Sequence, residues 1–512
     1  MTLARTRSIA LVGVVGHLVD VEAHLAQGLP GLTLIGLPDT SLSESRDRIR
    51  AAVVNSREAW PPQRITLNLS PASLPKSGSS FDLALAVCVL AAADGVDPRW
   101  VADLVLLGEL GLDGRVRPVR GVLPAVLAAA RAGVERVVVP AANAFEASVV
   151  PDVRVVAVSS LAELLAVLRC EIPVPDIATR APGPVDLEGG PDLLDVAGQH
   201  DARYALEIAA AGGHHLLLHG PPGSGKTMLA ERLPGILPAL SRAQAIEVTA
   251  IHSVAGQLPA GVSLIERAPF RAPHHTSSAA AIVGGGSGLA RPGAASLAHH
   301  GVLFLDEAPE FARGVLDGLR QPIESGRVVL DRSRGTVDYP ARFQLVLAAN
   351  PCPCGLAATS VACTCPPLRQ RAYVGRLSGP LMDRIDLAVH VPQPSKVDLL
   401  EGTGGESSAT VAARVADARE RALARWRGTP WQCNAHVPGA VLRSASWRLV
   451  PGDLGRVHDE LARGALSARG VDRVLRVAWT LADLAGKDRP QRPEVELAVQ
   501  LRLASALPGL AA

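Results

Sequence analysis

The sequence predicts a multidomain α/β protein whose central domain is built on an open parallel sheet that binds a nucleotide. Three observations carry this prediction: a glycine-rich motif spans 219–227, a short apolar strand ends in two carboxylates at 306–307, and another apolar strand ends at Asn350. At 512 residues the chain is too long for one hydrophobic core. Its 48% hydrophobic and 20% charged content excludes a disordered protein.

The glycine-rich motif follows the apolar run at 216–218 and precedes a helical pattern, which is the context that a phosphate loop requires. Lys226 is expected to meet the β- and γ-phosphates of ATP, and Thr227 is expected to hold Mg²⁺. A glycine-rich turn without a ligand is the alternative. The predicted nucleotide-binding residues are Gly220, Pro221, Pro222, Gly223, Ser224, Gly225, Lys226, Thr227 and Asp306.

The two carboxylates end the apolar run that starts at Gly301. Asp306 is placed to bind Mg²⁺ through water, and Glu307 is placed to polarise the water that attacks the γ-phosphate. The amide of Asn350 would orient the same water. The alternative is a buried strand with a solvated acidic end.

Composition divides the remaining chain. Strand-like runs alternate with alanine-rich helical runs over 1–171, a proline-rich linker follows at 172–191, the nucleotide-binding domain covers 192–395, and 396–512 is expected to be helical. The net charge of +2 means that any nucleic-acid affinity must come from local basic patches. No apolar run has the length of a membrane span and no cleavage site follows the N-terminal apolar run, so we expect no membrane partner and a cytoplasmic protein.

Longer motifs surround the phosphate loop, at 270–276, 284–286, 291–293, 296–299, 319–324, 350–355 and 377–386. Together they resemble the YifB/ComM family of magnesium-chelatase-like AAA+ ATPases, and the resemblance covers essentially the whole chain. Two positions depart from the family pattern: Ala294 stands where a glutamate is usual, and His300 where an asparagine is usual.

The resemblance implies a ring, a homo-hexamer, in which each nucleotide lies between neighbouring subunits. Arg384 matches the arginine finger of such rings, and an ion pair with Asp383 or Asp386 is its alternative role. Arg469 matches the arginine of the C-terminal helical lid that senses γ-phosphate. Arg473 and Arg476 follow at i+4 and i+7, so the three would share one helix face, as residues of an ordinary basic face also would.

Four of the seven cysteines fall within fourteen residues, at Cys352, Cys354, Cys363 and Cys365. In a reducing compartment such a cluster favours a structural metal site over disulfides, and four thiolates suit Zn²⁺. The C-x-C spacing is tighter than in common zinc motifs, and uncoordinated thiols are the alternative. The paired histidines at 274–275 and 299–300 receive no role.

The first domain resembles the proteolytic domain of Lon, a ribosomal S5 domain 2-like α/β fold. Ser80 stands at the nucleophile position, but Leu123 stands at the position of the lysine base, and leucine cannot accept a proton. The resemblance therefore indicates a scaffold or a module that contacts nucleic acid. Four basic residues would supply such contacts: Lys76, Arg115, Arg117 and Arg120.

The segment 324–343 is predicted to form a β-hairpin just before the strand that ends at Asn350. It carries four arginines against two aspartates over 327–342, and Arg332 and Arg334 at its tip are candidate contacts to DNA phosphates. A solvated tip without a partner is the alternative.

The resemblance thus implies a hexameric ATPase that acts on single-stranded or branched DNA, by branch migration or unwinding, in recombination or natural transformation. A protein-remodelling or metal-chelatase-type motor is the second hypothesis. An ATP-dependent protease is the third, and Leu123 argues against it.

Overall fold

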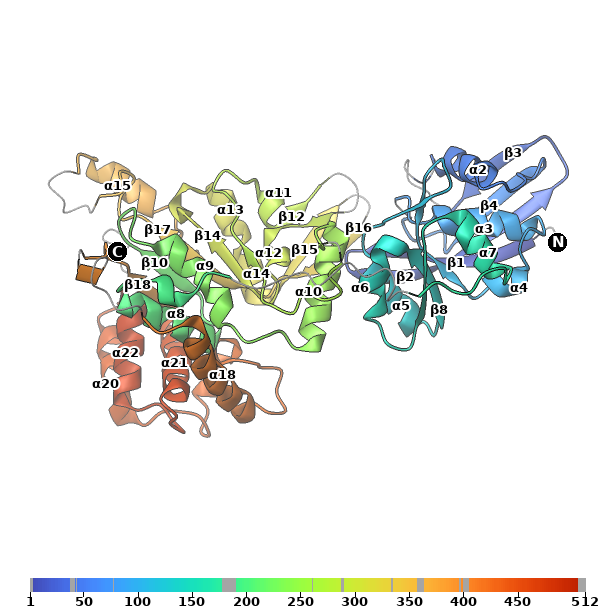
Figure 1. The fold of residues 1–512 in the computed structure, drawn as a ribbon. Coiled ribbons are helices and arrows are strands. Elements are labelled where there is room, and N and C mark those ends of the chain that lie inside the picture. Colours follow the sequence, from blue (N-terminus) through green and yellow to red (C-terminus); the bar gives the residue numbers. More distant parts are fainter. Residues whose placement is uncertain are drawn as a thin grey trace.

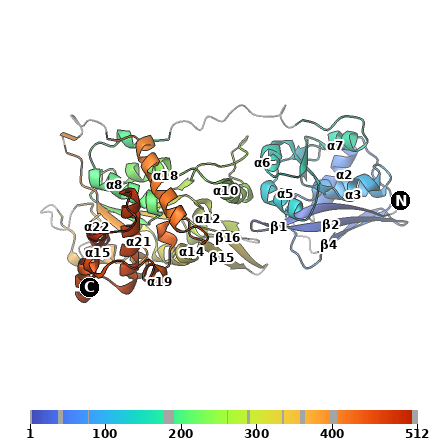
Figure 2. The same ribbon diagram turned by 90° about the horizontal axis from the view of Figure 1, so that it is seen from below.

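The computed structural model describes residues 3–504, except 37–41, 43, 77, 177–189, 260, 287–289, 333–334, 357–362, 396 and 399–404. It is a mixed α/β protein, as predicted. Two parts that each contain a large sheet lie side by side, and the helices after residue 405 pack on the second part (Figures 1 and 2). Most of the predicted linker at 172–191 lies outside the described residues.

The first part is built on a seven-stranded mixed sheet with the order β3-β4-β2-β1-β5-β8-β9. Apolar and polar residues alternate along β1 and β2 with the two-residue period of a strand. The two strands pair antiparallel along all of β1. The strands are β1 (Leu3–Val12), β2 (Val15–Ala26), β3 (Gly31–Ile35), β4 (Arg64–Ser70), β5 (Val105–Leu106), β8 (Arg136–Pro140) and β9 (Arg154–Val158), beside a small β6 (Glu109–Leu110) and β7 (Val116–Arg117) ladder.

Helices cover both faces of this sheet. Leu106 belongs to the core under α3, whereas its neighbours Val105 and Leu107 belong to the core under α5, so these two helices lie on opposite faces. Every residue of α3 is buried, as its continuous apolar sequence requires. The helices are α2 (Ser45–Asn55), α3 (Asp82–Ala92), α4 (Pro98–Val101), α5 (Val122–Arg131), α6 (Ala144–Ser148) and α7 (Leu161–Leu168).

The second part contains the predicted parallel sheet. Its order is β11-β14-β17-β10-β18, and each neighbouring pair runs parallel. Because helices cover both faces, the strands are mostly apolar, with their polar residues at the strand ends, rather than alternating. The strands are β10 (Leu216–His219), β11 (Phe270–Arg271), β14 (Val302–Leu305), β17 (Gln344–Ala349) and β18 (Leu387–His390).

Helices and small ladders complete this part. The helices are α8 (His200–Gly212), α9 (Lys226–Ile236), α10 (Arg242–Ala255), α11 (Ala279–Ile282), α12 (Ala294–Leu297), α13 (Arg313–Gly318), α14 (Arg320–Ser325), α15 (Pro367–Val374) and α16 (Gly379–Met382). The ladders are β12 (Gly284–Gly285) with β13 (Arg291–Pro292), and β15 (Arg327–Arg332) with β16 (Gly335–Pro340).

All assigned elements after residue 405 are helices. Their apolar faces join the core of the second part through α8 and α9, and Trp426, Trp447 and Trp479 pack together inside. The main helices are α18 (Ser408–Arg425), α19 (Gly439–Leu442), α20 (Gly455–Ala462), α21 (Ala468–Leu484) and α22 (Arg492–Leu503). Among the described residues, no helix combines the length and apolar character needed to cross a bilayer.

Candidate active site

The phosphate-loop residues 220–225 join β10 to α9, which begins at Lys226. Gly223 and Gly225 have φ angles of 72° and 90°, in the left-handed region that glycine adopts without strain. A β-carbon at Gly220 would overlap the carbonyl oxygen of Val391. The loop therefore needs glycine at three positions, and it leads into a helix N-terminus that favours an anion.

Lys226 lies over this loop. Its side-chain nitrogen donates to the carbonyl oxygens of Gly220 and Pro221, each at 2.8 Å. Burial lowers the pKa of Lys226, and the nearby carboxylates Asp306 and Glu307 oppose that shift. The ammonium group is thus held where a phosphate on the loop would meet it.

The hydroxyl of Thr227 donates to a carboxylate oxygen of Asp306 at 2.7 Å. The contact joins the start of α9 to the end of β14, across 79 residues of sequence. Hydroxyl and carboxylate oxygens are ligands that Mg²⁺ accepts together with water and phosphate oxygens. The two predicted magnesium residues are therefore adjacent, and their chemistry fits the ion.

Glu307 follows Asp306 in a left-handed conformation with φ of 50°, which is unusual for a residue other than glycine. The side chain is about half exposed, and one carboxylate oxygen lies 3.4 Å from Nδ1 of His275. The sequence alone predicts no role for His275. His275 follows β11, and the parallel pairing of β11 with β14 brings this segment beside Glu307. A strand of two residues is too short to recognise from the sequence.

Asn350 follows β17 at the same edge of the sheet, because β17 lies parallel between β14 and β10. The buried hydroxyl of Tyr373, on α15, lies against the backbone of Asn350, and burial raises the pKa of Tyr373 to about 12. The three predicted strands thus end together beside the phosphate loop.

Arg384 does not lie beside the phosphate loop of its own chain. Its side chain is buried and pairs with Glu324 and with the carbonyl oxygen of Pro380, rather than with the alternative partners Asp383 and Asp386. The Nε atom has no hydrogen-bond partner within the described part of the chain.

The parallel register places Arg384 at the edge of the sheet opposite the phosphate loop. Arg384 precedes β18, and the backbone N–H of Asp386 donates to the carbonyl of His215, just before β10. Five residues of extended chain from His215 to Gly220 span roughly 17 Å. Arg384 therefore cannot reach the phosphate loop of its own chain.

A cavity of about 620 Å³ opens at this opposite edge. Arg469, Arg473 and Arg476 all line it, which confirms that they share one face of α21. Arg469 is exposed at the start of the helix. Three further arginines line the same cavity: Arg342, Arg384 and Arg419. The cavity is therefore rich in groups that bind phosphate.

Asp386 anchors this edge. Its buried carboxylate pairs with Arg473 at 2.8 Å and accepts the backbone N–H of His215 at 2.9 Å. Although burial opposes ionisation, Arg473 and the buried His214 hold the pKa of Asp386 well below its usual value. The contact joins β18, β10 and α21.

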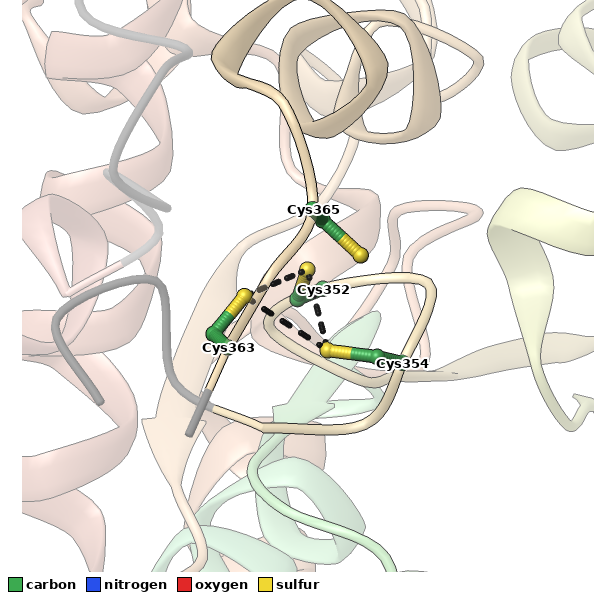
Figure 3. Close-up of side chains that lie close together, drawn as sticks. All are labelled: Cys352, Cys354, Cys363 and Cys365. Atoms are coloured by element: carbon green, nitrogen blue, oxygen red, sulfur yellow. Dashed lines mark hydrogen bonds between the residues drawn. The ribbon is translucent and has the colours of Figure 1, made fainter. Parts of the chain in front are cut away.

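The four cysteines of the cluster come together (Figure 3). Their sulfur atoms all lie within 4.8 Å of one another, and each thiol is free. Cys352 and Cys354 follow β17, and Cys363 and Cys365 precede α15. The clustering that the sequence predicted is thus present in the fold.

Comparison with known proteins identifies the family. Family models described as magnesium chelatase, subunit ChlI, as subunit ChlI of Mg-chelatase, and as magnesium chelatase, subunit ChlI C-terminal match residues 192–399, 21–143 and 405–502. Competence protein ComM of Haemophilus influenzae is 41% identical over 98% of both chains. YifB of Escherichia coli is 41% identical over 98% of this chain and 97% of its own. The chain belongs to the YifB/ComM family.

Two further relatives are similar to all or part of the chain. An uncharacterized protein of Mycobacterium tuberculosis is 53% identical over 99% of this chain and all of its own. Lon protease of Syntrophomonas wolfei is 28% identical over 163 residues, which are 29% of this chain and 20% of that protein. A YifB/ComM protein of this magnesium-chelatase-like type is an AAA+ ATPase that uses ATP and Mg²⁺, and this class forms oligomers.

The paired histidines 299 and 300 have a structural explanation in this YifB/ComM chain. Both Nε2 atoms lie 3.0 Å from the same carboxylate oxygen of Glu247. The Nδ1 atom of His299 accepts the backbone N–H of Arg342, so Nε2 carries the proton of the neutral ring and cannot also bind a metal. His300 thus forms a hydrogen bond, while the other departure, Ala294, begins the short helix α12.

The first part has Ser80 at the matched nucleophile position of a serine–lysine protease but lacks the lysine base at the other matched position. Leu123 is fully buried in α5, as a core residue. Lys76 was expected to be a surface contact for nucleic acid, and this prediction was wrong: it is 1% exposed and donates to the carbonyl of Pro71. Arg115, Arg117 and Arg120 are exposed.

The predicted hairpin is confirmed as the antiparallel pair of β15 and β16, with Arg332 opposite Gly335. Arg332 is exposed, whereas Arg334 lies outside the described residues. Of the other two arginines, Arg327 pairs with Asp338 at 2.6 Å and Arg342 lines the cavity at the far end. Of the described arginines of the hairpin, Arg332 is thus the one exposed at the tip.

Proposed function

We propose that the chain is the subunit of a homo-hexameric ring motor that hydrolyses ATP and acts on single-stranded or branched DNA in the cytoplasm, by branch migration or unwinding in recombination or natural transformation. Its cofactors are ATP, Mg²⁺ and a zinc ion held by the four cysteines. The domains at 1–171, 192–395 and 396–512 act as scaffold, motor and helical lid.

The contact between Thr227 and Asp306 is the observation that carries the ATPase part of this proposal. It places beside Lys226 a hydroxyl that binds Mg²⁺ and a carboxylate that binds the ion through water, while Lys226 binds the β- and γ-phosphates. Glu307 polarises the attacking water and Asn350 orients it. The remaining phosphate-loop residues, 220–225, supply backbone N–H groups.

The position of Arg384 supports the ring. It precedes β18 at the edge of the sheet opposite its own phosphate loop, a strand length of roughly 17 Å away, and it lines a cavity that Arg469 also lines. A neighbouring subunit whose nucleotide enters this cavity would receive both guanidinium groups, and these would offset the charge that develops on the γ-phosphate. Each active site is then shared between two chains.

The hairpin tip supports contact with DNA. On one side of the hairpin, Val337 and Tyr339 are buried against Val12 and Val14 of the first part, so the exposed tip with Arg332 is the side that faces a partner. The relative from Haemophilus influenzae is named competence protein ComM, and this name supports a role of the present chain in natural transformation.

The DNA contact is tested by the double variant Arg332→Ala with Arg334→Ala. Because phosphate contacts release counterions, DNA binding should weaken alike for all sequences, and the log–log salt slope should fall by about one unit per lost contact. The variant Arg327→Ala, at the base of the hairpin, is the control, since its charge is already paired with Asp338. Unchanged affinity and salt slope in the double variant would move the contact away from this tip.

The activity is tested by the ATPase rate in the presence of single-stranded, duplex and branched DNA. We expect DNA to raise the rate, most with single-stranded or branched substrates. The family description as magnesium chelatase favours a second candidate, a protein-remodelling or metal-chelatase-type motor. A rate that rises only with a protein partner would favour that candidate.

A further inference from the structure

The cysteine cluster closes a loop that begins and ends beside the nucleotide site. Cys352 and Cys354 follow Asn350 by two and four residues, and Cys365 precedes α15 by two residues. Figure 3 shows the four side chains pointing toward one another from these two segments. The two segments are thus joined at one point by sulfur atoms.

The sulfur positions fit one tetrahedral ion. Three Sγ–Sγ distances are 3.5, 3.6 and 3.6 Å, among Cys352, Cys354 and Cys363, and the fourth sulfur lies within 4.8 Å of these three. Zn–S bonds of about 2.3 Å in a tetrahedron place sulfurs roughly 3.8 Å apart. Four thiolates without oxygen or nitrogen ligands favour zinc over magnesium or calcium, which prefer oxygen.

One side-chain amide donor lies beside the sulfurs. The side-chain amide of Gln370 donates to Sγ of Cys363 at 3.5 Å and to the carbonyl oxygen of Cys365 at 3.1 Å. Such donors around the ligands orient them and stabilise their negative charge. Within the described part of the chain, the printed contacts of these sulfurs are with one another and with Gln370, whereas the histidine pair at 299 and 300 contacts the carboxylate of Glu247.

The loop carrying two of these cysteines touches the phosphate loop. Gly355 has φ of 81° and donates to the carbonyl of Cys352 at 2.8 Å. A β-carbon at Gly355 would overlap Pro222 Cγ and lie 2.9 Å from Pro222 Cδ, so the Gly355 backbone packs directly on the proline ring. On the other segment, Tyr373 of α15 lies against Asn350. The cluster therefore braces the site on two sides.

We infer that Cys352, Cys354, Cys363 and Cys365 bind one structural Zn²⁺ ion, and that this ion holds Gly355 against Pro222 and so keeps the phosphate loop in its nucleotide-binding shape. The second half of the inference rests on the proposed nucleotide site. Loss of zinc frees the turn at Gly355, and the loop then has to be ordered by the nucleotide itself, which weakens binding.

The experiment measures zinc and nucleotide affinity on the same full-length protein. Zinc is counted by elemental analysis and by release with an organomercurial in the presence of a zinc-sensitive dye, and affinity is measured with a fluorescent ADP. Wild type should carry about one zinc per chain. Cys354→Ser should lose it and bind the nucleotide about tenfold more weakly, whereas Cys170→Ser, an exposed thiol outside the cluster, should match wild type in both.

Two further measurements separate the causes. Gly355→Ala keeps all four thiols, so it should retain zinc and still lose affinity, and zinc added back to chelated wild type should restore affinity. Lys226→Ala should keep zinc and lose nucleotide binding, which tests the proposed function independently. Freshly reduced wild type without zinc overturns the metal site. Full affinity in a folded, zinc-free Cys354→Ser protein, judged by circular dichroism, overturns the coupling.

Discussion

A mixing experiment tests whether each active site is shared between two subunits. Arg384→Ala should bind ATP but lose turnover about a thousandfold, because an arginine finger contributes at least that much to phosphoryl transfer. Glu307→Gln should also bind ATP without turnover, because it lacks the water-polarising carboxylate. Since Arg384 lies at the edge of the sheet opposite its own phosphate loop, the two defects concern different subunits at each site.

Mixing therefore restores some sites. In a ring with head-to-tail interfaces, a site is intact when an Arg384→Ala subunit supplies Glu307 and its neighbour, a Glu307→Gln subunit, supplies Arg384. In an equal mixture this order occurs at about one interface in four. We expect steady-state ATPase activity to reach about a quarter of the wild-type rate when interfaces act independently.

A matched control uses Lys226→Ala in place of Arg384→Ala. Lys226 and Glu307 belong to the same site of the same chain, so their mixture contains no intact site and should stay inactive. Subunit exchange is verified by a fluorescent label. If ATPase activity then rises at no ratio of Arg384→Ala to Glu307→Gln, Arg384 does not complete the active site of a neighbouring subunit.

Two further predictions concern groups at that edge. Asp386→Ala should lower the free energy of unfolding by about 3–5 kcal/mol in urea denaturation, because it leaves Arg473 unpaired. The control Asp383→Ala removes a partly exposed carboxylate and should lower the free energy of unfolding by about 1 kcal/mol or less. Because the pKa of Asp386 is depressed in the folded state, its contribution to the free energy of unfolding is complete above the unfolded pKa and is lost as pH falls below about 4. If Asp386→Asn unfolded in acid with the same pH dependence as wild type, this prediction would be contradicted. Burial alone would raise the pKa of Cys433, but the neighbouring His436 lowers it to about 7. The rate of Cys433 alkylation, measured by mass spectrometry across pH, should therefore have its midpoint near pH 7. In His436→Gln this midpoint should shift to higher pH.

The nucleotide site was the most predictable part of the molecule. Its signals are local: a glycine spacing, a strand before it, a helix after it, and carboxylates at a strand end. Parallel strands bring their carboxyl ends to one edge, so Thr227 and Asp306, which are 79 positions apart, are expected to meet without knowledge of the segment between them. The hairpin was predictable for the same reason, because alternation and a polar turn are visible in a short window.

Long-range contacts outside the nucleotide site were not predictable from the sequence. The partner of Arg384 is Glu324, sixty residues away, rather than an aspartate beside it in sequence. His275 meets Glu307 only because a two-residue strand aligns with β14. Lys76 was expected at the surface, since lysine is rarely buried, but its ammonium group finds a carbonyl inside the fold. Such partners depend on tertiary packing, for which sequence windows carry no signal.

Movement of a mobile four-way DNA junction by the purified protein tests the central claim most directly. Gel electrophoresis of a labelled junction should show ATP-dependent conversion to duplex products by wild type. Glu307→Gln should bind the junction in the presence of ATP and leave it unconverted, because water activation is lost while nucleotide binding remains. Conversion by Glu307→Gln at the wild-type rate, or no conversion by a wild-type protein that hydrolyses ATP, would contradict the account of an ATP-driven motor acting on DNA.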